Sequence, residues 1–214
     1  EKMVDELEQV LKYLHKKKNN PKPKTLLVSQ FNMQEKFIEL IDREIANAKS
    51  NFKGHIIIKL NNLQDPVMIE KLYEASKAGV KIDLIIRGIC CLVPDLKEYS
   101  RNINVIRIVD RYLEHARIFW FSNKGNAEIF MGSADWMKRN LYFRIEVIFP
   151  ILNEDHKNEI ERNLEIQLKD NLKAVKLDSE LNNIEQPKPK RKRTAQKGFY
   201  TWLKSRNTYQ LNNQ

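Results

Sequence analysis

The residues best suited to chemistry lie in the octapeptide at residues 110–117, Asp-Arg-Tyr-Leu-Glu-His-Ala-Arg. It places one imidazole, His115, between two guanidinium groups, Arg111 and Arg117. Imidazole can donate or accept a hydrogen bond or attack as a nucleophile, and arginine holds phosphate oxygens in a planar fork. An anionic ligand therefore suits this stretch. A salt-bridged surface loop that simply exposes His115 explains the octapeptide equally well.

An apolar run at residues 118–121 follows the octapeptide and predicts a buried strand. His115 and Arg117 would then lie at the start of a rigid element and face the same way, because side chains alternate along a strand. Residues 124–126 predict a tight turn after this strand. Residues 132–136 follow the return strand, and their small side chains would allow a ligand to approach the backbone closely.

Two further apolar runs, at residues 55–60 and 80–87, are typical of strands, and the segment between them is typical of a helix. A strand–helix–strand unit predicts two parallel strands. Ligands of such sheets bind beyond the carboxyl ends of the strands. We therefore expect Lys59 and Arg87, at the ends of these two runs, to converge on one edge. Each could also be a strand-end charge that meets only water.

The rest of the chain yields further elements by the same periodicities. Strands are predicted at residues 25–29, 103–109, 127–131 and 142–149, and helices at residues 1–18, 31–50, 153–172 and 199–203. Arg144 and Glu146 would share one face of their strand, either as a buried ion pair or with the arginine directed at a ligand.

Composition points to a polyanionic partner. The chain has 214 residues, 42% of them hydrophobic, which is enough for one substantial core. Its formal net charge of +10 is typical of proteins that meet nucleic acid, a phosphate polymer or an anionic membrane surface. The basic run at residues 187–193 is either a mobile tail or a clamp for such a polymer.

Cysteine usage and hydropathy limit the cellular compartments that fit this chain. The two cysteines, Cys90 and Cys91, are neighbours, which fits a reducing compartment and no disulfide framework. No Cys and His spacing typical of a metal site occurs, and the apolar runs are only strand-length. No signal peptide opens the chain. We expect a cytoplasmic protein whose basic surface could touch anionic lipids.

Two groups of motifs resemble known families. His115-Ala116-Arg117 and the Gly-Ser pair at residues 132–133 are similar to the His-x-Lys and Gly-Ser elements of the phospholipase D superfamily, with Arg117 in place of the lysine and Ser122 in place of an aspartate. Five longer stretches, in the same order, resemble the last part of bacterial polyphosphate kinase: Lys-Leu-Asn-Asn-Leu at 59–63, Arg-Gly-Ile-Cys at 87–90, Ile-Val-Asp-Arg-Tyr-Leu-Glu-His at 108–115, Ser-Ala-Asp-Trp-Met at 133–137 and Arg-Ile-Glu-Val at 144–147.

The resemblance implies an α/β, phospholipase D-like domain with a mixed β-sheet flanked by helices. It divides the chain into a helix and linker from the joining region at residues 1–24, the C-terminal catalytic domain at 25–185, and a basic tail with a short terminal helix at 186–214. The family transfers the terminal phosphate of ATP reversibly to inorganic polyphosphate, through a phosphohistidine that belongs to its other catalytic domain. The chain alone is therefore expected to be inactive.

The resemblance also implies partners and roles. The partners are ATP or ADP, inorganic polyphosphate, the remaining domains of the same polypeptide and further copies of the enzyme, with nucleic acid not expected. Mg²⁺ is the implied cofactor, ligated mainly outside this chain. His115 matches the family's second active-site histidine, which contacts the transferred phosphates, and Arg87 and Arg144 match arginines that contact phosphates. Four further polar residues are expected to line the polymer's path: Lys59, Asn61, Arg111 and Arg117.

Two other functions stay open. A phospholipase D-like nuclease would need paired His-x-Lys sites, and this chain has one variant copy. A non-catalytic module that binds polyanions or nucleic acid would depend on net charge and on the run at residues 187–193. Its affinity would then fall steeply with salt whether or not His115 is present.

Overall fold

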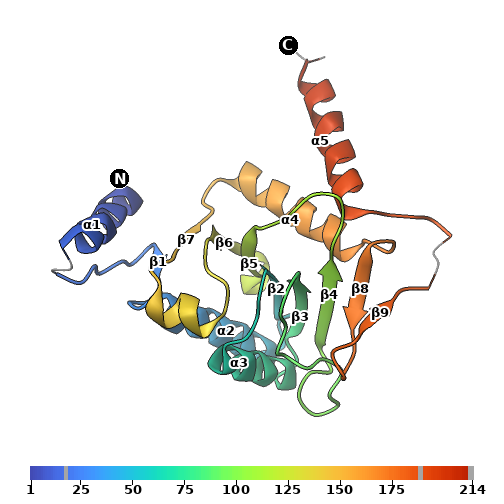
Figure 1. Cartoon of the computed structure of the whole chain (residues 1–214), viewed down its shortest axis with the longest axis horizontal. Helices are drawn as coiled ribbons and strands as arrows, with labels where there is room; N and C mark the ends of the chain where they lie inside the picture. The colour runs from blue at the N-terminus through green and yellow to red at the C-terminus, as the bar shows by residue number, and fades with distance from the viewer. Residues whose placement is uncertain (17–18, 188–189, 212–214) are drawn as a thin grey trace.

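A single nine-stranded mixed sheet organises the chain, in the order β1-β7-β6-β5-β2-β3-β4-β8-β9 (Figure 1). The computed structural model describes residues 1–16, 19–187 and 190–211. The strands are β1 (Leu27–Val28), β2 (His55–Leu60), β3 (Lys81–Ile86), β4 (Ile103–Ile108), β5 (Arg117–Phe121), β6 (Glu128–Gly132), β7 (Val147–Pro150), β8 (Ala174–Leu177) and β9 (Asn183–Glu185). The predicted α/β class with a mixed sheet flanked by helices is confirmed.

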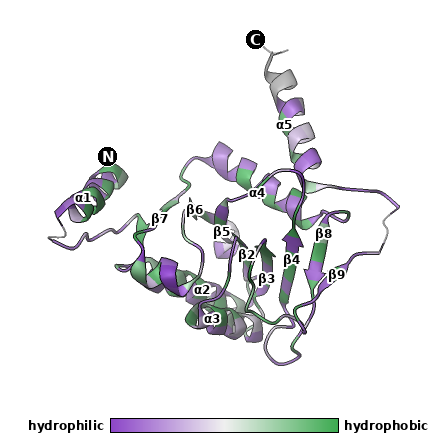
Figure 2. Ribbon diagram, in the orientation of Figure 1, coloured by the Kyte–Doolittle hydropathy of each residue, from purple (hydrophilic) through white to green (hydrophobic). Residues whose placement is uncertain are grey.

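Helices cover both faces of this sheet. They are α1 (Lys2–Lys16), α2 (Met33–Lys49), α3 (Pro66–Lys77), α4 (Glu154–Leu168) and α5 (Ala195–Leu211). Helices α2 and α3 pack on one face, and α4 with the start of α5 packs on the other. Figure 2 shows hydrophobic residues on β2 and β3, between these layers. Strands buried on both faces are apolar at nearly every position, as in β2, where Ile56 and Ile58 face α2 and α3 while Ile57 faces α4.

The predicted strand–helix–strand unit is confirmed. β2 and β3 are parallel and in register over their whole length, and β4 continues the parallel set beside β3. β5 runs antiparallel to β2 on its other side and forms the predicted hairpin with β6. The carboxyl ends of β2 and β3 therefore lie at the same edge of the sheet as the start of β5.

The strand predicted at residues 142–149 is wrong in its first half. Residues Arg139–Phe143 form a π-helical turn, and β7 begins only at Val147. The backbone N–H of Arg144 donates to the carbonyl of Arg139 at 2.9 Å, and the Arg144 carbonyl accepts from the Ser29 hydroxyl at 2.7 Å. Because these backbone groups are already paired, they cannot join a ladder, and the period-two argument for Arg144 fails.

The C-terminal part of the chain also differs from expectation. The sequence predicted no strand after α4, yet β8 pairs with β4, and β9 pairs with β8. The terminal helix is longer than the predicted 199–203 and begins at Ala195, which is buried against α4. Residues 17 and 18 of the first predicted helix and residues 188 and 189 of the basic run lie outside the described residues.

The first helix is fixed to the sheet by one acidic side chain. Glu6 accepts hydrogen bonds from the backbone N–H groups of Thr25 and Leu26 at 3.0 and 2.8 Å. Val10 is buried beside Leu26 and Val28. Within the described part of the chain, no helix combines the length and apolar character needed to cross a membrane.

Candidate functional site

The candidate site lies where the ends of β2 and β3 meet the start of β5, at one edge of the sheet. Lys59 in β2 lies opposite Ile118 in β5. Asn61 and Arg87 directly follow β2 and β3, and His115 lies two residues before β5. We call this edge of the sheet the rim. His115 itself is not in a strand, because the ladder begins only at Arg117.

Arg87 and His115 meet at the rim. The Nη2 of Arg87 lies 3.4 Å from the Nδ1 of His115, while its Nε donates to the Oδ1 of Asn61 at 2.8 Å. A guanidinium can only donate, so this contact matches the imidazole tautomer that accepts at Nδ1 and carries its proton on Nε2. His115 is exposed, and Arg87 is half-buried. The pair thus presents an N–H donor and a fixed cation to the solvent.

Arg117 holds the backbone of the His115 segment rather than standing free. Its Nε and Nη2 each donate to a different oxygen of Asp135 at 3.1 Å, and its Nη1 donates to the carbonyl of His115 at 2.8 Å. Asp135 is 2% exposed and also accepts from the N–H of Asn61 at 2.8 Å. A forked ion pair fixes geometry as well as charge. Asp135 therefore joins the ends of two strands, a role that the sequence did not assign to it.

The ammonium group of Lys59 is also already paired with other side chains. It is buried and forms an ion pair with Glu114, and its Nζ donates to the Oε1 of Gln167 at 2.7 Å. Burial lowers the pKa of Lys59, and the Glu114 carboxylate raises it only in part, so the pKa stays below its usual value. Glu114 already neutralises the charge of Lys59. The expectation that Lys59 lines the path of the polymer therefore remains a prediction.

The other two predicted arginines lie apart from this pair. Arg111 is exposed, and among the described residues no acceptor bonds to its guanidinium. Arg144 follows the π-helical turn, and its Nη1 approaches Glu146 at 4.0 Å. The described residues show no contact between Arg144 and His115. The structure therefore brings together His115, Arg87 and Asn61, while the phosphate contact expected of Arg144 remains a prediction.

Gln196 is a further residue of the site that sequence reasoning missed. Its Oε1 accepts from the N–H of Tyr112, and its Nε2 donates to the Tyr112 carbonyl and to Glu114. Helix α5 thus holds the segment that carries His115. Between this segment, α4 and α5 lies a cavity of about 420 Å³, with Lys59 and His115 in its lining. No signal near Gln196 could have shown this contact, because it joins residues 84 positions apart.

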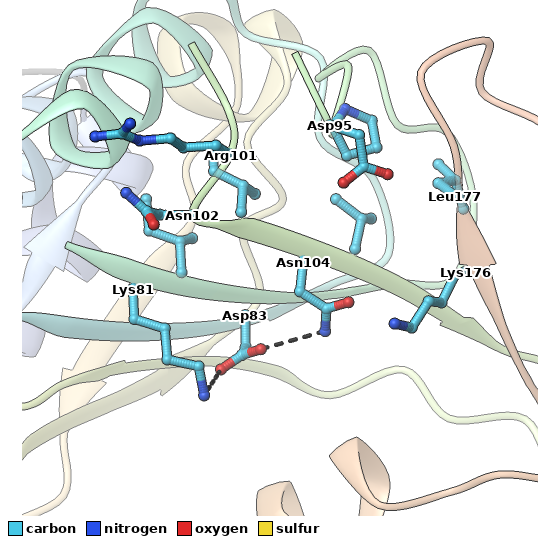
Figure 3. Close-up of a pocket in the computed structure, with 12 residues that line it drawn as sticks. Lys81, Asp83, Asp95, Arg101, Asn102, Asn104, Lys176 and Leu177 are labelled. Atoms are coloured by element: carbon cyan, nitrogen blue, oxygen red, sulfur yellow. Dashed lines mark hydrogen bonds and ion pairs between the residues drawn. The ribbon is translucent and has the colours of Figure 1, made fainter. Parts of the chain in front are cut away.

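A second cavity, of about 400 Å³, opens at the opposite edge of the sheet, where β3 and β4 begin (Figure 3). Asp83 is its buried centre and forms contacts with Lys81 at 2.9 Å, Asn104 at 3.2 Å and the His55 ring at 2.8 Å. Burial raises the pKa of Asp83, but the hydrogen bonds from His55 and Lys81 outweigh it, so the pKa is lowered. These groups satisfy one another and stabilise the fold.

The acidic side chains at the rim do not form a Mg²⁺ site. Mg²⁺ is bound by oxygen ligands in near-octahedral geometry. The two carboxylates of the rim, Glu114 and Asp135, are each already paired with a cation. Among the described residues, no group of three or more acidic, histidine or cysteine side chains could hold a metal ion. The residues present at the rim therefore do not fit Mg²⁺ as their own ligand.

Comparison with known proteins identifies the family. Residues 26–197 match the family model described as polyphosphate kinase C-terminal domain 2. The chain is 50% identical over 157 residues to polyphosphate kinase 1 of Chlorobaculum tepidum, covering 73% of this chain and 22% of that protein. It is 45% identical over 181 residues to the polyphosphate kinase of Klebsiella pneumoniae, covering 84% of this chain and 26% of that protein.

A solved structure agrees. The crystal structure of polyphosphate kinase from Porphyromonas gingivalis superposes with a TM-score of 0.92 at 47% identity, covering 97% of this chain and 32% of that one. The chain therefore spans between 22% and 32% of the length of these relatives. The family model covers most of the chain, and together with these identities it shows that the chain belongs to the polyphosphate kinase family.

Proposed function

We propose that the chain supplies one side of the active site of a polyphosphate kinase, which transfers the terminal phosphate of ATP to inorganic polyphosphate and back. The observation that supports this most directly is the contact between Arg87 and His115 on the exposed rim. Phosphoryl transfer needs little covalent chemistry from the protein beyond positioning and neutralisation of charge on the phosphate oxygens. A fixed guanidinium beside an imidazole N–H provides both.

The proposed step uses each group in one role. The bond between the terminal phosphorus and its bridging oxygen breaks, and a bond forms to the acceptor, which by family resemblance is a histidine outside this chain. Arg87 neutralises charge on the phosphate oxygens, and Asn61 fixes the direction of its guanidinium. The Nε2–H of His115 donates to the bridging oxygen as negative charge develops there, so that ADP leaves as a stabilised anion.

The remainder of the same polypeptide is the partner that this site requires. Two large apolar side chains directly before His115 are strongly exposed: Tyr112 at 66% and Leu113 at 76%. Exposed apolar groups of this size that gather near a site are typical of an interface. We propose that the other catalytic domain covers this edge and brings the phosphorylated histidine and Mg²⁺, and that the isolated chain is inactive.

The test is turnover in the full-length enzyme. His115→Ala and Arg87→Ala should each lower the rate of polyphosphate synthesis from labelled ATP by about a hundredfold or more. Two exposed residues away from the rim serve as matched controls, His156→Ala and Arg101→Ala, and should keep the rate of the wild type. Synthesis within about twofold of the wild-type rate in His115→Ala would show that the proposed proton or hydrogen-bond donation is wrong.

A further inference from the structure

A strongly basic cavity lies on the far side of α5 from His115. It has a volume of about 600 Å³ and is bounded by the second half of α4, the end of the basic run and the first turns of α5. Six cationic side chains line it: Arg162, Lys169, Arg191, Lys192, Arg193 and Lys197.

Most of this charge has no counter-ion. Glu165 accepts from Arg162 at 3.0 Å and from Lys169 at 3.3 Å. Among the described residues, no carboxylate lies within ion-pair distance of the other four cations, which come from the basic run and the first turn of α5. These four side chains are exposed and carry the same charge, so an anion that enters the cavity would relieve their mutual repulsion.

The backbone at residues 191–193, the end of the basic run, is anchored by hydrogen bonds. Asn171, three residues after the end of α4, accepts from the N–H of Arg193 at 2.8 Å, and its side-chain amide donates to the carbonyl of Arg191 at 3.0 Å. Asp170 accepts from the N–H of Ala195 at 2.6 Å, which fixes the start of α5. Cations on a fixed backbone lose less entropy on binding than cations on a free tail, so this arrangement favours a bound ligand.

The shape and chemistry favour a chain of phosphates over a nucleic acid. A single phosphate needs two or three donors, and six cations spread over two helices and a connecting segment can contact several phosphates in succession. Single-stranded nucleic acids also need free aromatic faces for their bases. The one aromatic ring of the cavity, Trp202, stacks on Phe199 at 5.5 Å and lies under the guanidinium of Arg206 at 5.0 Å.

We propose that this cavity is a second binding site for inorganic polyphosphate, separate from the His115 site, that retains the polymer between successive transfers. The proposal rests on the proposed function for the identity of the polymer. The two sites adjoin through α5, because Gln196 holds the His115 segment while the next residue, Lys197, lines the basic cavity. A polymer retained there stays close to the rim after each transfer.

The test measures binding of long-chain polyphosphate and of tripolyphosphate to the 214-residue chain over a salt series. The variant Arg191→Gln/Arg193→Gln/Lys197→Gln should bind long polyphosphate at least about tenfold more weakly, with a salt slope lower by about two, while tripolyphosphate binding changes little. The charge-retaining variant Arg191→Lys/Arg193→Lys/Lys197→Arg should bind like the wild type. The anchoring bonds use backbone atoms of the two arginines, so the fold should persist, which an unfolding midpoint checks.

Matched controls separate this site from charge in general and from the proposed function. Lys49→Gln/Lys53→Gln/Lys124→Gln removes the same charge from exposed positions at the opposite edge of the sheet and should bind long polyphosphate like the wild type. Equal weakening by both triple variants would overturn the proposal. The proposal would also be overturned if single-stranded DNA bound the wild type as tightly as polyphosphate does and if the Arg191→Gln/Arg193→Gln/Lys197→Gln variant weakened the binding of both polymers equally. Arg87→Ala should weaken tripolyphosphate binding, and failure of that result alone would count against the proposed function, not the second site.

Discussion

The side-chain amide of Gln196 forms hydrogen bonds with both backbone groups of Tyr112: its Oε1 accepts from the N–H at 3.0 Å, and its Nε2 donates to the carbonyl at 2.7 Å. This paired contact resembles one step of a β-ladder made by a side chain. It ties α5 to the exposed segment that carries His115, three residues further along.

Gln196→Ala should loosen this segment without unfolding the sheet. We expect kcat of the full-length enzyme to fall about threefold to tenfold with little change in KM, because the three hydrogen bonds from Gln196 that position the His115 segment are lost. Gln64→Ala, at an exposed glutamine whose side chain has no bond among the described residues, is the control and should match the wild type.

Asp135→Asn should reduce stability far more than a surface change. The carboxylate is buried, pairs with Arg117 in a fork and accepts from the backbone of Asn61. Removing one member of a buried ion pair leaves the other charge uncompensated, which costs about 3 kcal/mol of unfolding free energy. Urea unfolding measures this loss. Arg117→Lys should also destabilise, since an ammonium group cannot donate in a fork, and stability equal to the wild type in both variants would contradict the assigned role.

Asp83 should make stability depend on acid pH. Its pKa in the folded chain lies below the usual value, so its stabilisation is complete above the unfolded-state pKa and is lost as pH falls through the folded-state pKa. Asp83→Asn should therefore be less stable than the wild type near neutral pH, by about 1 kcal/mol or more, and the difference should shrink in acid. Asp95→Asn, at an exposed residue that lines the same cavity, is the control and should keep the wild-type stability near neutral pH.

Gly88→Ala should disturb the rim through the backbone. A Cβ at this position would lie 2.7 Å from the Oδ1 of Asn62 and 2.9 Å from the carbonyl of Asn61. The Gly88 N–H already donates to that carbonyl at 2.7 Å, so neither strand end can move away freely. We expect a loss of about 1–3 kcal/mol in unfolding free energy together with weaker tripolyphosphate binding, measured on the same preparation. Unchanged binding would show that Arg87 does not depend on this close approach.

The sequence predicted the elements whose structure depends on residues close together in the chain. The apolar runs of β2 and β3 and the helix between them were sufficient to place Lys59 and Arg87 at one edge of the sheet, because parallel strands end together. The hairpin after His115 was predicted in the same way from its turn residues.

Contacts between distant segments could not be predicted. Asp135 and Gln196 act on residues 18 and 84 positions away, and nothing in their neighbouring sequence indicates those partners. Residues 142–146 are β-like in composition, yet their backbone groups are taken by a π-helical turn and by Ser29. Tertiary context overrode strand propensity there, as it often does in half-buried segments.

The place of β5 in the sheet has a consequence for folding. It pairs with β2, so the ladder that carries the rim joins Ile58 to Phe119, two residues separated by about sixty positions. Closing so long a loop costs entropy before any contact offsets it, and pairings of this kind form late. Amide protons of β2 and β5 should therefore exchange with solvent only on global unfolding, while those of the His115 segment exchange through local opening. The rim thus exists only in the fully folded chain, which makes its ligand affinity a sensitive report of complete folding.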